Sequence, residues 1–193
     1  MNDVDQNDWQ QWWDARQSAL ESVLGPSDGM VGHALIPFFV GVELGGSSDL
    51  LYFRSHIPGV VTVTASLIGD KSQVKNEMGN YELAICHRDD EQWGPEFISK
   101  LAYMTLDAKL EPRETIGGGE QLTPEGSTIS AFLFADYGRF TVRGTPAGLL
   151  MMVGITEDEL AVCRDGYRED VERALWRDGI WPYTDLYRES VRF

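Results

Sequence analysis

Several side chains of the sequence could perform acid–base or nucleophilic chemistry, and their spacing decides whether they could act together. Cys86 and His87 are a thiol next to a base, but adjacent residues of a strand point to opposite faces and cannot exchange a proton directly. His87 also begins a His-Arg-Asp triplet, which lacks the Leu and the later Asn of a kinase catalytic loop. No GxSxG nucleophile motif occurs. We therefore predict no catalytic residue.

Carboxylates are abundant, and a pair of them could in principle act as acid and base. Six of them gather in one predicted helical region: Glu157, Asp158, Glu159, Glu169, Asp170 and Glu172. Most of these positions fall at a helix start or on a solvent face, where a carboxylate interacts favourably with the helix dipole and keeps the protein soluble. A small hydrolase built on Glu82, His87 and this acidic helix remains an alternative from a different functional class.

The sequence lacks the residue patterns that a metal site or a phosphate-binding site requires. The three histidines, His33, His56 and His87, show no short zinc-type spacing. The glycine-rich segment 117–119 is followed by Glu120 and lacks the Lys-Ser/Thr of a phosphate-binding loop, so it is typical of a turn. We predict no metal site and no cofactor.

The charge balance excludes two classes of partner. The 193 residues include 31 acidic and 16 basic side chains, which gives a formal charge of -15. Nucleic-acid binding depends on Lys and Arg neutralising phosphates, so a chain of this charge is expected to bind neither nucleic acid nor an anionic membrane. Many acids together with surplus aromatic residues suit a basic protein partner.

The candidate partner-binding residues are chosen for their expected exposure. Trp9, Trp12 and Trp13 fall within five residues, which is more than one buried helical stripe can hold. We therefore select Trp12 as an aromatic contact. The acidic contacts that we select are Asp89, Asp90 and Glu91, which lie between a predicted strand and a predicted helix.

The elements that must position these residues alternate between helical and strand patterns. A helix is predicted over about residues 8–24, because apolar residues follow helical spacing until Gly25-Pro26. Short runs of Val, Ile, Phe and Thr predict strands, of which 60–68 has one apolar face and one wetter hydroxyl face. A loop then leads to a strand over 81–86, and Pro95 suits the first turn of a second helix.

The second half of the chain repeats this alternation. Strands are predicted over 128–134 and 149–155, and the Thr156-to-Glu159 segment is a capping box that opens a helix. This helix is expected to bend near Gly166, and the aromatic tail 181–193 to pack back on the body. The fold class that these patterns predict is α+β, with a mixed, largely antiparallel sheet against a few helices, in a single domain spanning 1–193.

Compartment signals are few. The chain opens without the basic and apolar segments of a secretory signal, and its longest apolar run, 147–155, is about half as long as a membrane-spanning helix. Cys86 and Cys163 stand far apart without a CxxC motif. We interpret them as free thiols in a reducing compartment, with a disulfide as the alternative, and expect a cytoplasmic protein.

The stretch from about residue 45 to 191 resembles the Suppressor of fused (SUFU) domain family, in its bacterial single-domain type. The resemblance depends on the order and spacing of several motifs, of which the Tyr-Glu-Leu strand followed by a Trp-bearing helix start is the most specific. The motifs are Asp49-Leu50-Leu51-Tyr52-Phe53, the Pro58-to-Thr64 segment, Gly79-Asn80-Tyr81-Glu82-Leu83-Ala84-Ile85, Trp93, the Leu101 helix, the Gly154-to-Leu160 segment, Gly166 and the tail from Asp185 to Val191.

The resemblance implies a mixed α+β domain that binds other proteins and has no established catalytic machinery. In animals the founding member clamps a peptide of Gli-type transcription factors, whereas single-domain bacterial members look like immunity proteins that neutralise secreted toxins. The resemblance thus favours a non-enzymatic immunity protein whose partner is a basic toxin domain. The alternative is an intracellular regulator that adds a partner's peptide strand to its sheet edge.

Overall fold

The computed structural model describes residues 3–36, 44, 46–89, 91–117 and 123–193, and its central feature is one seven-stranded sheet. The strand order is β1-β2-β3-β4-β7-β6-β5, and every neighbouring pair is antiparallel except β4 and β7, which are parallel. This confirms the predicted α+β class with a mixed, largely antiparallel sheet. In chain order the elements are α1 (Asp3–Leu24), β1 (Val31–Gly32), β2 (Leu50–Phe53), β3 (Val60–Thr64), β4 (Asn80–His87), α2 (Trp93–Leu101), the 3-10 helix η3 (Ala102–Leu106), β5 (Thr115–Gly117), β6 (Ile129–Val142), β7 (Thr145–Thr156), α3 (Glu157–Arg164) and α4 (Arg168–Arg177).

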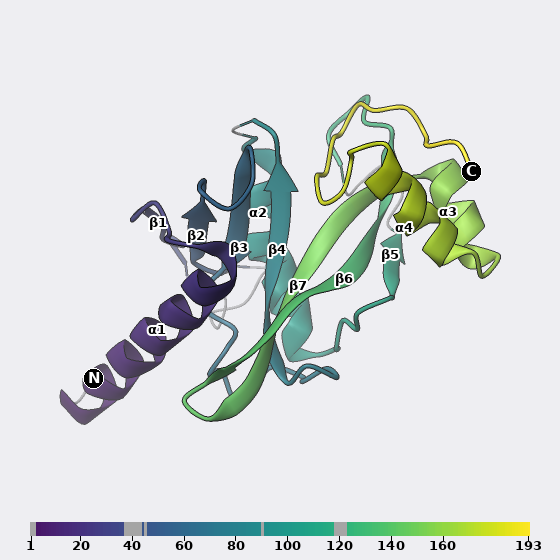
Figure 1. Cartoon of the computed structure of the whole chain (residues 1–193). Coiled ribbons are helices and arrows are strands. Elements are labelled where there is room, and N and C mark those ends of the chain that lie inside the picture. Colours follow the sequence, from purple (N-terminus) through teal and green to yellow (C-terminus); the bar gives the residue numbers. More distant parts are fainter. Residues whose placement is uncertain (1–2, 37–43, 45, 90, 118–122) are drawn as a thin grey trace.

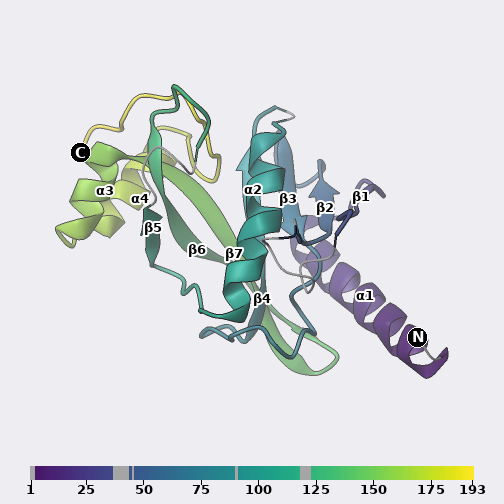
Figure 2. The ribbon, with the colours of Figure 1, turned by 180° about the vertical axis from the view of Figure 1, so that it is seen from behind.

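Helices cover both faces of the sheet. On one face α1 lies over one part of the sheet, and α3, α4 and the C-terminal tail lie over another part (Figure 1). The opposite face carries α2, as seen from behind in Figure 2. The two faces have separate apolar cores, one containing Leu20 and Leu24 of α1, the other containing Ile98 and Leu101 of α2. Burial of both faces explains why β4 and β7 are rich in apolar residues and almost fully buried.

The prediction of a wetter face on the third strand was wrong. All five residues of β3 are buried, including Thr62 and Thr64, because the strand lies inside the sheet and α2 covers its second face. The strand also ends at Thr64, four residues earlier than predicted. The hydroxyl of Thr64 donates to the buried carboxylate of Glu82 at 2.6 Å, so its polarity is satisfied inside the protein.

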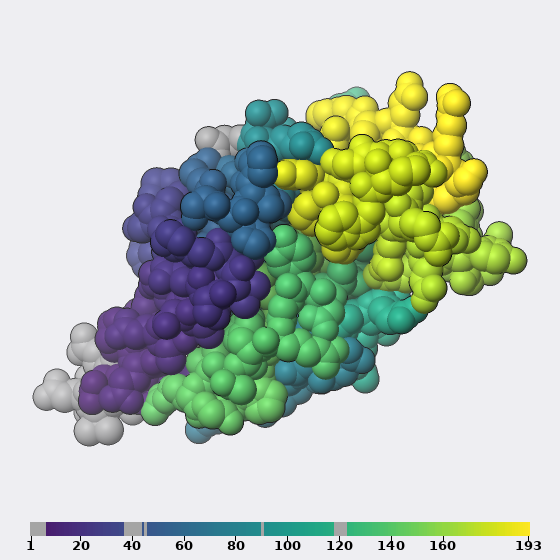
Figure 3. Space-filling view, viewed as in Figure 1, coloured from purple at the N-terminus to yellow at the C-terminus, as the bar shows by residue number. Residues whose placement is uncertain are grey.

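A long hairpin joins β6 and β7, and half of it was absent from the prediction. β6 continues to Val142, eight residues beyond the predicted end, and a two-residue turn connects Val142 to Thr145. Both turn residues, Arg143 and Gly144, have positive φ angles of 50° and 78°, as a tight hairpin turn requires. Figure 3 shows this hairpin alongside α1, and Arg143 of its turn lies against Trp12 of the helix.

Helix boundaries follow the local signals in the sequence. α1 ends at Leu24, and Gly25, with a φ of 76°, donates its N–H to the carbonyl of Glu21. The capping box between Thr156 and Glu159 is present at the start of α3 and confirms that prediction. α1 begins at Asp3, about five residues before the predicted start.

The two cysteines lie in different elements and are free. Cys86 is buried in β4, and Cys163 is half-buried in α3. No helix among the described residues is long and apolar enough to cross a bilayer.

Candidate partner-binding site

A cavity of about 530 Å³ opens between α1 and the segments around β3, and three tryptophans line it. We call it the tryptophan pocket. Helix α1 contributes one wall with Asp8, Trp9, Trp12, Trp13 and Arg16. Ser47, Asp49, Ala65, Ser66 and residues 68–71 contribute the other. The site therefore combines a helix from the start of the chain with loops at the ends of β2 and β3.

A buried carboxylate fixes the helix to the opposite wall. Glu82 is fully buried in β4 and accepts hydrogen bonds from the Thr64 hydroxyl at 2.6 Å and from the N–H groups of Leu67 and Ile68 at 2.9 and 2.8 Å. The Arg16 Nε lies 3.8 Å from the same carboxylate, and its Nη1 donates to the Ile68 carbonyl at 2.9 Å. Glu82, considered above as a catalytic acid, thus binds the segment at Leu67 and Ile68 that forms part of the pocket wall.

Burial dominates the titration of this pair. It raises the pKa of Glu82, and the Arg16 charge, followed by the hydrogen bonds from Thr64, Ile68 and Leu67, opposes that rise. Burial likewise lowers the pKa of Arg16, and the negative charges of Glu82 and Asp49 oppose it. Burial thus works against the charged form of both groups, and the opposite charge of the partner works in its favour.

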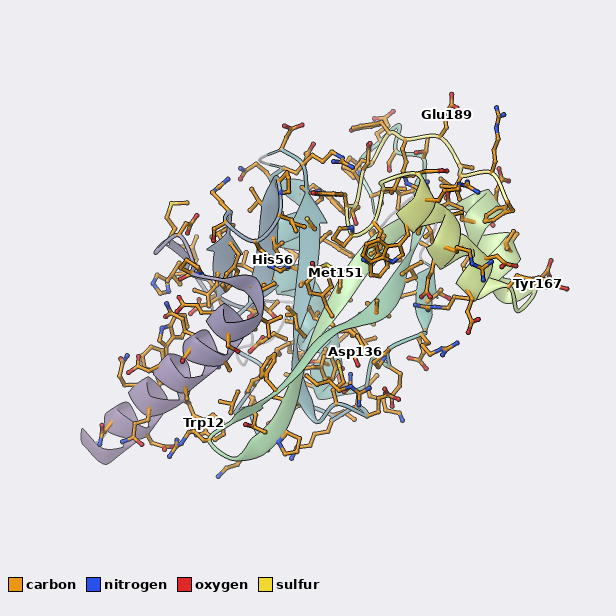
Figure 4. The ribbon with its side chains drawn as sticks, viewed as in Figure 1. Trp12, His56, Asp136, Met151, Tyr167 and Glu189 are labelled. Atoms are coloured by element: carbon orange, nitrogen blue, oxygen red, sulfur yellow. The ribbon has the colours of Figure 1, made fainter. Side chains whose placement is uncertain are left out.

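The indole rings are held by stacking and by close backbone approach. Trp9 and Trp13 stack with ring centroids 5.6 Å apart, and 52% of Trp9 is exposed. Trp12 packs against Gly69, where a Cβ would lie only 2.7 Å from the indole Cε3. The guanidinium of Arg143, at the tip of the β6–β7 hairpin, lies 4.8 Å from the Trp12 ring centroid. Figure 4 shows Trp12 in this position between α1 and the hairpin.

The acidic residues selected from the sequence lie elsewhere. Asp89 and Glu91 are exposed between β4 and α2, and with Tyr52 and His87 they line a second cavity of about 370 Å³. Asp90 lies outside the described residues. Trp12 lines the first cavity and not the second, so the structure separates the aromatic candidate from the acidic ones.

Sequence reasoning identified one residue of the tryptophan pocket and missed its polar walls. Arg16 follows Trp13 by three residues, a helical spacing that places both on one face of α1, and this signal was available in the sequence. Asp49 and Asp70 come from loops far along the chain from α1, and no local pattern places them beside it.

The histidine of β4 is a packed structural residue. His87 is 3% exposed, and its Nδ1 lies 3.0 Å from the Thr184 carbonyl, which can only accept, so Nδ1 carries the hydrogen. Its Nε2 has no protein partner among the described residues and abuts Gly94, where a Cβ would lie 1.9 Å away. Burial lowers the pKa of His87 to about 4, against a smaller opposing effect of the bond to Thr184.

The carboxylate and histidine of the hydrolase alternative are far apart. Glu82 and His87 are separated by five positions on β4, which corresponds to roughly 17 Å, and they point to opposite faces of the sheet. Glu159 of the acidic helix is buried and bound to Arg188. Within the described ranges no three His, Cys, Asp or Glu side chains form a group that could hold a metal ion.

The buried histidine predicts a stability that falls with acid. Because the folded pKa of about 4 lies below the ordinary value near 6.5, the unfolded chain takes up this proton first. The stabilisation is complete above about pH 6.5 and is lost as the pH falls towards 4, by on the order of 3 kcal/mol. Urea unfolding between pH 7 and 4 should show this loss in the wild type.

The matched variants are His87→Asn, which keeps a donor for Thr184 but cannot be protonated, and His33→Asn, which changes an exposed ring. The first should remove this part of the pH dependence and the second should leave it. The raised pKa of Glu82 acts in the opposite direction, but it is common to all three proteins and cancels in the comparison. If the free energy of unfolding of His87→Asn varies with pH in the same way as that of the wild type, the prediction is contradicted.

Comparisons with known protein families and solved structures give consistent matches. The family model for "Suppressor of fused protein (SUFU)" matches residues 60–189. No curated protein matches the chain. A crystal structure of a SUFU homologue from Neisseria gonorrhoeae matches with a TM-score of 0.67 and 18% identity over 95% of this chain and 98% of that chain.

Two further solved structures share the fold. The crystal structure of a Sufu–Fu complex matches with a TM-score of 0.68 and 15% identity over 93% of this chain and 91% of that chain. Drosophila Suppressor of Fused matches with a TM-score of 0.52 and 14% identity over 75% of this chain and 39% of that chain. At these identities the likeness is one of fold.

Proposed function

This chain belongs to the Suppressor of fused family, and from that membership we propose that it is a non-enzymatic domain that binds a basic protein partner. The observation that carries the proposal is the tryptophan pocket, where exposed and half-buried indoles lie in a concave surface with aspartates around them. Tryptophans in such pockets are typical anchors of protein interfaces. The Sufu–Fu structure, which has the same fold, is a complex with another protein, and this supports the proposal.

Long-range electrostatics favours a basic partner over an acidic one. The formal charge of -15 surrounds the molecule with a negative potential that attracts positive surfaces and repels nucleic acids. Complementary charge mainly increases the association rate, whereas buried aromatic anchors slow dissociation. We expect the acidic surface, including Asp89 and Glu91, to act in the first way and Trp12 in the second.

Within this role, we propose that the chain is an immunity protein that neutralises a basic toxin domain in the cytoplasm. The homologue from Neisseria gonorrhoeae, which has the same fold over 98% of its own chain, supports the bacterial type of role. Two free cysteines suit a reducing compartment, and this supports the location.

A regulator that adds a partner's strand to its sheet remains the second candidate, because the edge strand β5 pairs with only three of the fourteen residues of β6. β1 has two residues and β5 has three, and the two ends of β5 are exposed. Such edges leave backbone donors and acceptors for another strand.

Capture from the source cell tests the proposed function. The immobilised chain should retain a basic protein at low salt and release it as the salt concentration rises, and mass spectrometry would identify that protein. Trp12→Ala should weaken its retention, whereas Trp176→Ala, an exposed tryptophan of α4 outside the pocket, should not. Retention of acidic proteins only, or of no protein at any salt concentration, would contradict the proposal.

A further inference from the structure

We propose that the tryptophan pocket receives an arginine side chain of the partner protein. This inference rests on the proposed function and specifies the chemistry of its main contact. Three features of the pocket carry it: the guanidinium groups that its indoles already contact, the charge of its lining, and the acceptors that its aspartates leave unused.

The indoles of the pocket already contact two guanidinium groups of the chain itself. Arg16 lies 5.2 Å from the ring centroid of Trp13, and Arg143 lies 4.8 Å from that of Trp12. Trp9 stacks on Trp13 and is 52% exposed, so it adds accessible aromatic surface at the mouth. Planar cations are attracted to the faces of indole rings, and arginine forms such contacts more often than lysine.

The lining of the pocket carries a net negative charge. Asp8 is paired with Arg143, and Arg16 is paired with the buried Glu82, so Asp49 and Asp70 face only Lys71 and the lining keeps one net negative charge. The Arg16 charge is directed at the buried Glu82 carboxylate, 3.8 Å away, and one of its N–H groups is taken by a backbone carbonyl. An incoming cation would therefore meet more negative than positive charge.

The carboxylates of the pocket have acceptor positions to spare. Asp70 accepts from the Ser72 N–H through Oδ1 at 2.6 Å, and no protein group in the described ranges bonds its Oδ2. Asp49 accepts from the Ala34 N–H at 2.8 Å and lies 3.4 Å from His33, whereas Asp8 pairs with Arg143 at 2.6 Å. Each carboxylate oxygen can accept two hydrogen bonds, so Asp49 and Asp70 can still bind a donor.

Other occupants suit the pocket less well than arginine. An anion would meet three carboxylates, and an apolar side chain would remove their water without replacing its hydrogen bonds. A guanidinium can stack on an indole and donate to a carboxylate in the same plane, which a compact ammonium group cannot do. The volume of about 530 Å³ can accommodate a long side chain.

The test uses Nα-acetyl-L-arginine methylamide as the probe and the citrulline analogue, which has nearly the same shape without the charge, as its control. NMR spectra of the indole N–H groups, assigned by Trp→Phe variants, should show shifts of Trp9, Trp12 and Trp13 on titration with the arginine probe. Citrulline should bind at least about five-fold more weakly, because the cation–π and ionic contributions are absent.

A charge variant of the pocket should confirm where the probe binds. The double variant Asp49→Asn/Asp70→Asn should bind the arginine probe about five-fold or more weakly than the wild type. The matched control is Glu125→Gln/Asp165→Asn, which removes two exposed acids that have no side-chain partner in the described part of the chain and lie outside the pocket. Circular dichroism would verify that all variants are folded.

The outcomes separate this inference from the proposed function. Equal shifts with arginine and citrulline, shifts confined to other tryptophans, or no shifts would overturn the arginine site, even if a basic partner is captured. Failure to capture any basic protein would overturn the proposed function, even if the probe binds as expected.

Discussion

Arg188→Ala is expected to lower the free energy of unfolding by about 3 to 5 kcal/mol, because it leaves a buried carboxylate without its counter-charge. Glu159 is fully buried at the start of α3, and Arg188 of the C-terminal tail binds both of its oxygens at 2.5 Å. The carboxylate also accepts from the N–H groups of Thr156 and Val191. The Glu159 side chain therefore connects β7, α3 and the tail.

The measurement is urea unfolding of the wild type, Arg188→Ala and a matched control. Arg192→Ala removes a cation from an exposed residue of the same tail and should change stability by no more than about 0.5 kcal/mol. A loss of less than about 1 kcal/mol in Arg188→Ala would show that the pair does not hold the tail.

Arg16→Ala, at the opposite end of the protein, is expected to lower the free energy of unfolding by a similar amount, about 3 to 5 kcal/mol. Glu82 is fully buried, and Arg16 is its only cationic partner among the described residues. Loss of Arg16 also removes the bond to the Ile68 carbonyl that ties α1 to the far wall of the tryptophan pocket. The variant should therefore lose stability and also disturb the indole environment.

Two further variants distinguish a buried charge from a simple loss of side-chain volume. Arg16→Met/Glu82→Gln keeps most of the volume and removes both charges, so it should recover at least half of the stability lost in Arg16→Ala. Arg143→Ala, which removes a more exposed cation that contacts Trp12, should lower the free energy of unfolding by about 1 kcal/mol or less. Equal losses in all three proteins would contradict the role assigned to the Arg16–Glu82 pair.

Features that depend on a few neighbouring residues were predictable from the sequence. The end of α1 at Leu24 followed from Gly25-Pro26, and the start of α3 followed from the capping box between Thr156 and Glu159. The predicted strand over 149–155 lies within β7, which the structure buries almost completely.

Features that depend on distant segments were not predictable in the same way. Glu159 has a capping role that the sequence shows, but its burial depends on Arg188, 29 residues later. Thr62 is buried because α2 covers its face of the sheet, and a strand pattern alone cannot show whether both faces are covered. The walls of the tryptophan pocket likewise meet only in the folded chain, so Trp12 was found without Asp49 and Asp70.

The proposed function depends on the attraction of a basic partner by the negative surface of this protein-binding domain. Its most direct test is the association rate constant of the captured partner, measured by stopped flow as the salt concentration rises from about 20 to 500 mM. We expect the constant to fall by at least about ten-fold over this range, with a much smaller change in the dissociation rate. An association rate constant that stays the same across the range would contradict the proposed function.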